Sequence, residues 1–183
     1  MPIAEDFYLI VDLEATCSDQ GEVPRHEMEI IEIGAVILRS ATFEFESEFQ
    51  TFVRPVRHPE LTDFCKKLTH IAQSDVSAAP GFIEAFSALQ SWMSTYQRTL
   101  FCSWGDYDKD QIKQDCNFHK IEFPFDNHLN LKAEFSRALG LRKKMGINGA
   151  LGYLGLNFEG SPHRGIDDAR NIARIARRLF KGT

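Results

Sequence analysis

The sequence predicts an α/β fold in a single domain that spans residues 1–183. Three strand patterns follow one another within residues 7–53, as in an antiparallel meander. Helix and strand patterns then alternate through the rest of the chain. The 183 residues, 43% of them hydrophobic, are enough to bury one hydrophobic core but too few to bury two separate cores well.

The first predicted strand ends in two acidic residues. Phe7–Val11 are consecutive apolar residues, a pattern typical of a strand buried on both faces of a sheet. Asp12 and Glu14 follow, and their carboxylates share one side because alternate residues of a strand point the same way. Two acids at a buried strand end repel each other and call for a compensating cation, most simply a divalent metal. The alternative is a strand end that turns into solvent.

The next segments predict a loop and two more strands. Residues 17–27 are polar and contain glycine and proline, which favours a loop beside the acidic pair. Residues 29–38 are rich in β-branched side chains, and residues 43–53 alternate apolar with polar ones, so both predict strands. Glu32, inside the second strand, is either a further acid of the site or a residue that faces solvent or pairs locally.

Two helices are predicted in the middle of the chain. A short one follows Pro55 over residues 61–68, and residues 82–93 carry apolar side chains at helical spacing. Phe64 lies beside two lysines in the first of these helices. Its ring either packs in the core or stacks on a nucleic-acid base while the lysines meet phosphates.

A third acidic position follows the next strand. Residues 99–104 predict a buried strand, and a helix through Ile112 and Cys116 begins after it. Asp106 and Asp108 lie at this junction. An aspartate there either caps the helix or joins the first two acids.

The last part of the chain predicts one short strand and three helices. Residues 128–131 are extended, residues 132–139 are helical up to Gly140, and residues 147–154 form another short helix. The intervening basic run Arg142-Lys143-Lys144 either faces solvent or binds a phosphate backbone.

The final helix has apolar residues on one side and arginines on the other through residue 180. Asp168 lies in its first turns, where the positive end of the helix dipole favours a carboxylate, and His163 precedes it.

Together, strand ends and helix starts supply four carboxylates and one histidine: Asp12, Glu14, either Asp106 or Asp108, Asp168, and His163. A carboxylate set without cysteine suits hard divalent ions. Two such ions about 3.5 to 4 Å apart can stabilise the attacking and leaving oxygens of a phosphoryl displacement. A histidine with a pKa near neutrality can deprotonate the attacking water.

Composition limits the other possibilities. The net charge of −5 gives no general attraction to polyanions, so a phosphate partner must be held by metal ions or local basic patches. The four cysteines form no C-x-x-C pair, which indicates free thiols in a reducing cytosol. No signal peptide or membrane-spanning stretch is present, so we expect a soluble, cytoplasmic protein without membrane contact.

Several motifs, in the right order and over nearly the whole chain, resemble those of the DEDDh 3′-to-5′ exonucleases. They are Asp12-Leu13-Glu14-Ala15-Thr16, Glu29-Ile30-Ile31-Glu32-Ile33-Gly34, Trp104-Gly105-Asp106-Tyr107-Asp108 and the His163 to Asp168 spacing. Residues 61–65, 160–163 and 165–175 look most like the subgroup of histone-mRNA and small-RNA 3′ exonucleases and their bacterial KapD-type relatives.

This resemblance implies an RNase H-like fold with a mixed five-stranded sheet, three strands antiparallel and two parallel, and helices on both faces. It implies two Mg²⁺ or Mn²⁺ ions, His163 as the general base that releases nucleoside 5′-monophosphates, and these metal-binding acids: Asp12, Glu14, Asp108 and Asp168. Asp108 is favoured over Asp106 because Ile112 follows it by one helical turn, a spacing common in the family.

The resemblance also implies a substrate, the 3′ end of single-stranded nucleic acid, with RNA favoured over DNA. Ala15 and Thr16 would lie beside the terminal nucleotide, and the candidate stacking residues are Phe64, Trp104 and Tyr107. Two alternatives stay open. One is a DNA exonuclease of proofreading type, and the other is a catalytically silent nucleic-acid-binding module on the same fold.

Overall fold

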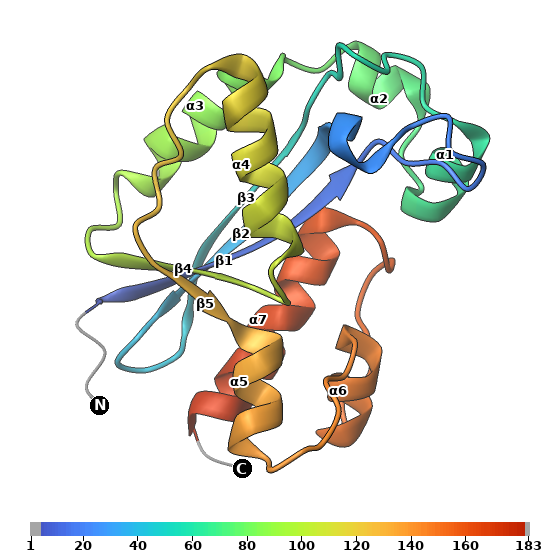
Figure 1. Ribbon diagram of the computed structural model, residues 1–183. Coiled ribbons are helices and arrows are strands. Elements are labelled where there is room, and N and C mark those ends of the chain that lie inside the picture. Colours follow the sequence, from blue (N-terminus) through green and yellow to red (C-terminus); the bar gives the residue numbers. More distant parts are fainter. Residues whose placement is uncertain (1–4, 182–183) are drawn as a thin grey trace.

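A mixed five-stranded sheet in the order β3-β2-β1-β4-β5 forms the centre of the computed structural model, which describes residues 5–181 (Figure 1). β1 (Phe7–Ala15) pairs antiparallel with β2 (Ile30–Arg39), and β2 pairs antiparallel with β3 (Phe45–Phe52). β4 (Thr99–Ser103) and β5 (His128–Asn130) extend the other edge of β1 in parallel. The predicted strand arrangement is confirmed.

The helices fill the connections between the strands. Their bounds are α1 (Asp63–Thr69), α2 (Gln73–Ser77), α3 (Phe82–Met93), α4 (Tyr107–His119), α5 (Leu131–Ala138), α6 (Ile147–Tyr153) and α7 (Gly165–Lys181). Two short elements were not predicted, namely α2 and a 3₁₀ turn over Arg25–Glu27. α1 begins later than the predicted residue 61 because Thr62 caps it, its side chain accepting from the Cys65 amide.

Both faces of β1 are covered, as the uninterrupted apolar run predicts. Leu9 and Val11 pack with α3 and α4 on one face. Tyr8 and Ile10 pack with α7 and α5 on the other. Because burial on both faces fixes the register of β1, it also fixes where its acidic end lies.

The first turn of α7 touches the sheet backbone directly. A Cβ atom added to Gly34 of β2 would lie 2.1 Å from the carbonyl carbon of Gly165, where only glycine leaves room. A Cβ atom on Gly165 would lie 3.0 Å from the carbonyl oxygen of Asp12. This close approach places the start of α7 at the acidic end of β1, and Figure 1 shows the first turn of α7 beside the arrowhead of β1. Among residues 5–181, no helix combines the length and apolar character needed to cross a membrane.

Candidate active site

A cavity of about 330 Å³ lies at the carboxyl end of β1. Its polar lining is the set of acids and the histidine that the sequence singled out: Asp12, Glu14, Asp108, Asp168 and His163. Apolar side chains from four other segments also line the wall: Met28, Leu68, Trp104 and Ile147. The structure therefore brings together residues from both ends of the chain.

Three of these acids could hold a metal ion. One carboxylate oxygen from each of Asp12, Glu14 and Asp168 lies within 4.8 Å of the other two. Glu14 and Asp168 are buried, and Asp12 is partly exposed. An all-carboxylate donor set of this kind suits Mg²⁺ or Mn²⁺ rather than a softer metal, so the residues present fit a hard divalent cation.

The electrostatics of the cluster favour such a cation. Burial, followed by repulsion from Asp108 and Asp168, raises the pKa of Asp12 well above its ordinary value. Burial, followed by repulsion from Asp168, raises the pKa of Glu14 to about 9. A bound cation would offset both the desolvation and the repulsion that raise these pKa values.

Asp108, and not Asp106, faces the acidic cluster. Asp108 is buried at the start of α4, and its carboxylate accepts a hydrogen bond of 3.1 Å from the Leu13 amide of β1. Burial raises the pKa of Asp108 to about 7, although this hydrogen bond opposes the shift. Asp106 is exposed and bonds to Lys109 and Asn130 instead. This placement supports Asp108 as the third aspartate.

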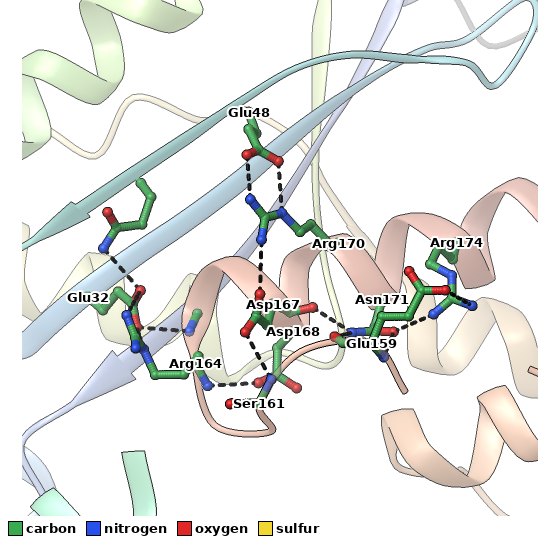
Figure 2. A network of polar contacts seen from close by, with 12 residues as sticks. Glu32, Glu48, Glu159, Ser161, Arg164, Asp167, Asp168, Arg170, Asn171 and Arg174 are labelled. Carbon is green, nitrogen blue, oxygen red and sulfur yellow. Dashed lines mark hydrogen bonds and ion pairs between the residues drawn. The ribbon is translucent and has the colours of Figure 1, made fainter. Parts of the chain in front are cut away.

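Two further hydrogen bonds hold the segment that carries His163. His163 is exposed and left-handed, with a φ of 62°, in the loop before α7. The next amide, of Arg164, donates to the Asp168 carboxylate at 3.1 Å. The Asp167 carboxylate accepts from the Ser161 amide at 2.9 Å, as Figure 2 shows. The loop is therefore tied to α7, the helix that carries Asp168.

Glu32 pairs with Arg164 instead of joining the cavity wall. Its buried carboxylate accepts from the Arg164 guanidinium at 3.0 and 3.2 Å and from the Gly165 amide at 3.0 Å (Figure 2). Gln50 of β3 donates a fourth hydrogen bond at 3.1 Å. Glu32 therefore neither lines the cavity nor faces solvent, and its main partners lie at the start of α7, far away in the sequence, so the predicted local pairing is wrong.

The predicted substrate-binding residues divide into two groups. Ala15, Trp104 and Tyr107 line the cavity, and the Trp104 indole donates to the Met145 carbonyl at 3.0 Å. Thr16 is buried and is not part of the lining, and its hydroxyl accepts a hydrogen bond of 2.9 Å from the Glu29 amide. Phe64 lies on α1 in a neighbouring hollow.

Besides Leu13, which lies between the two acids of the first motif, four residues of the cavity wall were not singled out from the sequence: Cys17, Met28, Leu68 and Ile147. Cys17 had one signal, since it directly follows the motif that ends at Thr16. The other three are single apolar residues in loops or short helices, and no local pattern distinguishes them from core residues.

Comparison with known proteins gives a consistent result. The model of the Exonuclease family (RNase T) matches residues 9–176. ERI1 exoribonuclease 3 of Mus musculus is 35% identical over 182 residues, which cover 94% of this chain and 53% of the relative. The 3′-5′ exoribonuclease 1 of Homo sapiens is 32% identical over 186 residues, with coverages of 96% and 53%. The chain thus spans about half the length of these curated relatives.

Solved structures agree with the sequence relatives. The nuclease domain of 3′hExo, a DEDDh family member bound to rAMP, superposes with a TM-score of 0.90 at 32% identity. That match covers 97% of this chain and 93% of the other. A 3′-exonuclease in a structure of 3′-end recognition of the histone mRNA stem-loop has a TM-score of 0.88 at 30% identity, covering 97% and 82%.

Proposed function

This chain belongs to the Exonuclease (RNase T) family and has DEDDh nucleases as its relatives, and from that premise we propose that it is a metal-dependent 3′-to-5′ exoribonuclease acting on single-stranded RNA ends. The observation that carries the proposal is the meeting of Asp12, Glu14, Asp168 and His163 in one cavity. The names of the sequence relatives, which are exoribonucleases, favour RNA over DNA.

The proposed cofactor is a pair of Mg²⁺ or Mn²⁺ ions. Asp12, Glu14 and Asp168 would hold them, with Asp108 as a supporting acid held by the Leu13 amide. When bound, such ions stabilise the charge on the attacking and leaving oxygens of a phosphodiester.

The protein's own side chains supply the remaining chemistry. His163 takes the proton of the attacking water, because it is an exposed imidazole on the rim of the acidic cluster. Ala15, Trp104 and Tyr107 form the wall against which the terminal nucleotide packs. The cavity, about 330 Å³, lies at the lower end of the range for small-molecule sites and suits one nucleotide at a time. The product is a nucleoside 5′-monophosphate.

The test is a degradation ladder on a 5′-labelled single-stranded RNA and its DNA twin, with Mg²⁺ or Mn²⁺ and with chelator. We expect stepwise loss of RNA from the 3′ end, no loss with chelator, and a fall of about 10²- to 10⁴-fold for His163→Ala. Asp108→Asn should also lose activity, whereas Asp106→Asn, two residues away and exposed, is the matched control and should retain it.

Two outcomes would contradict the proposal. DNA loss as fast as RNA loss would remove the RNA preference and favour the proofreading-type alternative. Unchanged chain shortening by both His163→Ala and Asp12→Asn would show that the proposed site does not perform the reaction.

A further inference from the structure

Two cysteines from separate segments meet beside the cavity. Cys17 is half-buried and lines the cavity wall, and Cys65 is fully buried in α1. The Thr62 hydroxyl joins their backbones, since it donates to the Cys17 carbonyl at 2.6 Å and accepts from the Cys65 amide at 3.0 Å. Cys17 also packs against the apolar cluster that contains Cys65.

The two side chains interact directly. Each thiol has the largest effect on the pKa of the other, which places the two side chains next to each other. The Cys65 Sγ in turn lies 3.7 Å from the carbonyl oxygen of Ala15, the residue that follows the metal-binding Glu14. A line of contacts thus runs from the cavity wall through both sulfurs to the end of β1.

The neighbouring Cys17 thiol lowers the pKa of Cys65 to about 7, against the opposing effect of burial, whereas Cys65 and burial raise the pKa of Cys17. Cys102 and Cys116 are also buried, but burial raises their pKa values, that of Cys116 to about 11. Since the thiolate is the reactive form of cysteine, the pair beside the cavity differs in reactivity from the other two thiols.

We propose that Cys17 and Cys65 are a redox-sensitive dithiol, which peroxides oxidise to a disulfide that impairs binding of the RNA 3′ end. The inference rests on the proposed function for its effect on RNA, but not for the oxidation itself. It adds a modification site to the wall of the cavity.

The chemistry balances with hydrogen peroxide as the oxidant. The pair gives up one proton and its two sulfurs share the other. When the shared proton lies on Cys65, Cys17, the partner that reaches the cavity, is the thiolate and attacks one peroxide oxygen. The O–O bond breaks, which leaves a sulfenic acid on Cys17 and a hydroxide that takes up the proton first released by the pair. The Cys65 sulfur then attacks the Cys17 sulfur and displaces the second water. Two thiols are oxidised, and one peroxide is reduced by two electrons to two waters.

The disulfide would change the cavity wall. A sulfur–sulfur bond of about 2.05 Å is much shorter than a thiol hydrogen bond, so its formation draws Cys17 toward α1 and away from the cavity. It also removes the Cys65 contact with the Ala15 carbonyl. Residues 15–17 directly follow Glu14, and a displacement of about 1 Å at a catalytic site can cost about 100-fold in rate.

The experiment compares reduced protein with protein treated with hydrogen peroxide. Of the four free thiols, we expect two to be lost, and peptide mapping should join Cys17 to Cys65. Binding of a fluorescent single-stranded RNA and its shortening should both fall, by about 100-fold for shortening, and dithiothreitol should restore both.

The variants separate this mechanism from general oxidation damage. Cys17→Ser and Cys65→Ser should each show the same RNA binding and shortening before and after peroxide, whatever their activity before the treatment. Cys102→Ser and Cys116→Ser, which remove the two remote thiols, should respond to peroxide as the unmodified protein does. Cys17 is half-buried, so its variant serves if Cys65→Ser fails to fold.

The inference and the proposed function can fail separately. A reduced protein that shortens no RNA would overturn the proposed function, while thiol counts and mapping would still report on the dithiol. Four thiols after peroxide, a disulfide between other cysteines, or an equal loss of RNA binding in Cys17→Ser would overturn the inference.

Discussion

Replacement of Glu32 by alanine tests how the protein holds its candidate base. The Glu32 carboxylate is completely buried, and it receives the Arg164 guanidinium and the Gly165 amide at the start of α7. His163 is the residue before Arg164, and the Arg164 amide bonds to Asp168. Loss of the carboxylate therefore leaves the Arg164 cation and the Gly165 amide without this partner, directly after His163.

The structure sets the size of the effect. Removing one partner of a buried ion pair costs about 3 to 5 kcal/mol. Because the Arg164 side chain is 26% exposed, water can partly solvate the guanidinium, and we expect the lower end, about 3 kcal/mol. For a chain of this length, that corresponds to a fall in Tm of about 6 to 12 °C.

The matched control is Glu48→Ala. Glu48 also pairs with an arginine of α7, Arg170, but both side chains are more than a third exposed, so the expected loss is below about 1 kcal/mol. Thermal unfolding followed by circular dichroism measures both variants, and RNA shortening below the Tm measures the effect on His163. Equal shifts in Tm for the two variants, or full activity in a Glu32→Ala protein that has lost stability, would refute this reasoning.

Two further predictions concern packing and protons. Gly34→Ala should lower the free energy of unfolding by about 3 kcal/mol in urea titration, because its Cβ would meet Gly165 backbone atoms, whereas Gly81→Ala has open space and should have little effect. Burial raises the pKa of Glu14 to about 9 and that of Asp108 to about 7, so without metal the contribution of these carboxyls to stability is fullest below about pH 4. That contribution falls as the pH rises to about 9, because the unfolded chain releases protons that the folded chain keeps. The Tm measured with chelator should therefore decline from pH 5 to pH 9. The decline should be smaller in Asp108→Asn. A Tm that rises across this range and is unaffected by that variant would contradict the assignment.

Local patterns were sufficient to predict the elements that position the acids. The apolar run before Asp12 and the one-sided apolar pattern of α7 each reflect burial of a continuous face, and such burial is visible in sequence spacing. The helix α2 and the 3₁₀ turn at Arg25–Glu27 are too short for a periodic pattern, so they were missed.

Long-range contacts explain the rest of the differences. The sequence left open whether the Glu32 carboxylate joins the site. In the structure it accepts a hydrogen bond from Arg164, which lies 132 positions away in the sequence. The Thr16 hydroxyl is occupied by a backbone amide, a partner that no residue-type pattern reveals. Leu68 and Ile147 reach the cavity wall because of how their helices pack, not because of any motif around them.

Direct titration of the metal-free protein with Mn²⁺ by calorimetry tests the central claim, that acids from both ends of the chain form one divalent-cation site. We expect saturable binding that is lost in Asp12→Asn and in Asp168→Asn and is retained in Asp106→Asn, whose exposed carboxylate lies outside the cluster. Identical isotherms for all three variants would contradict it.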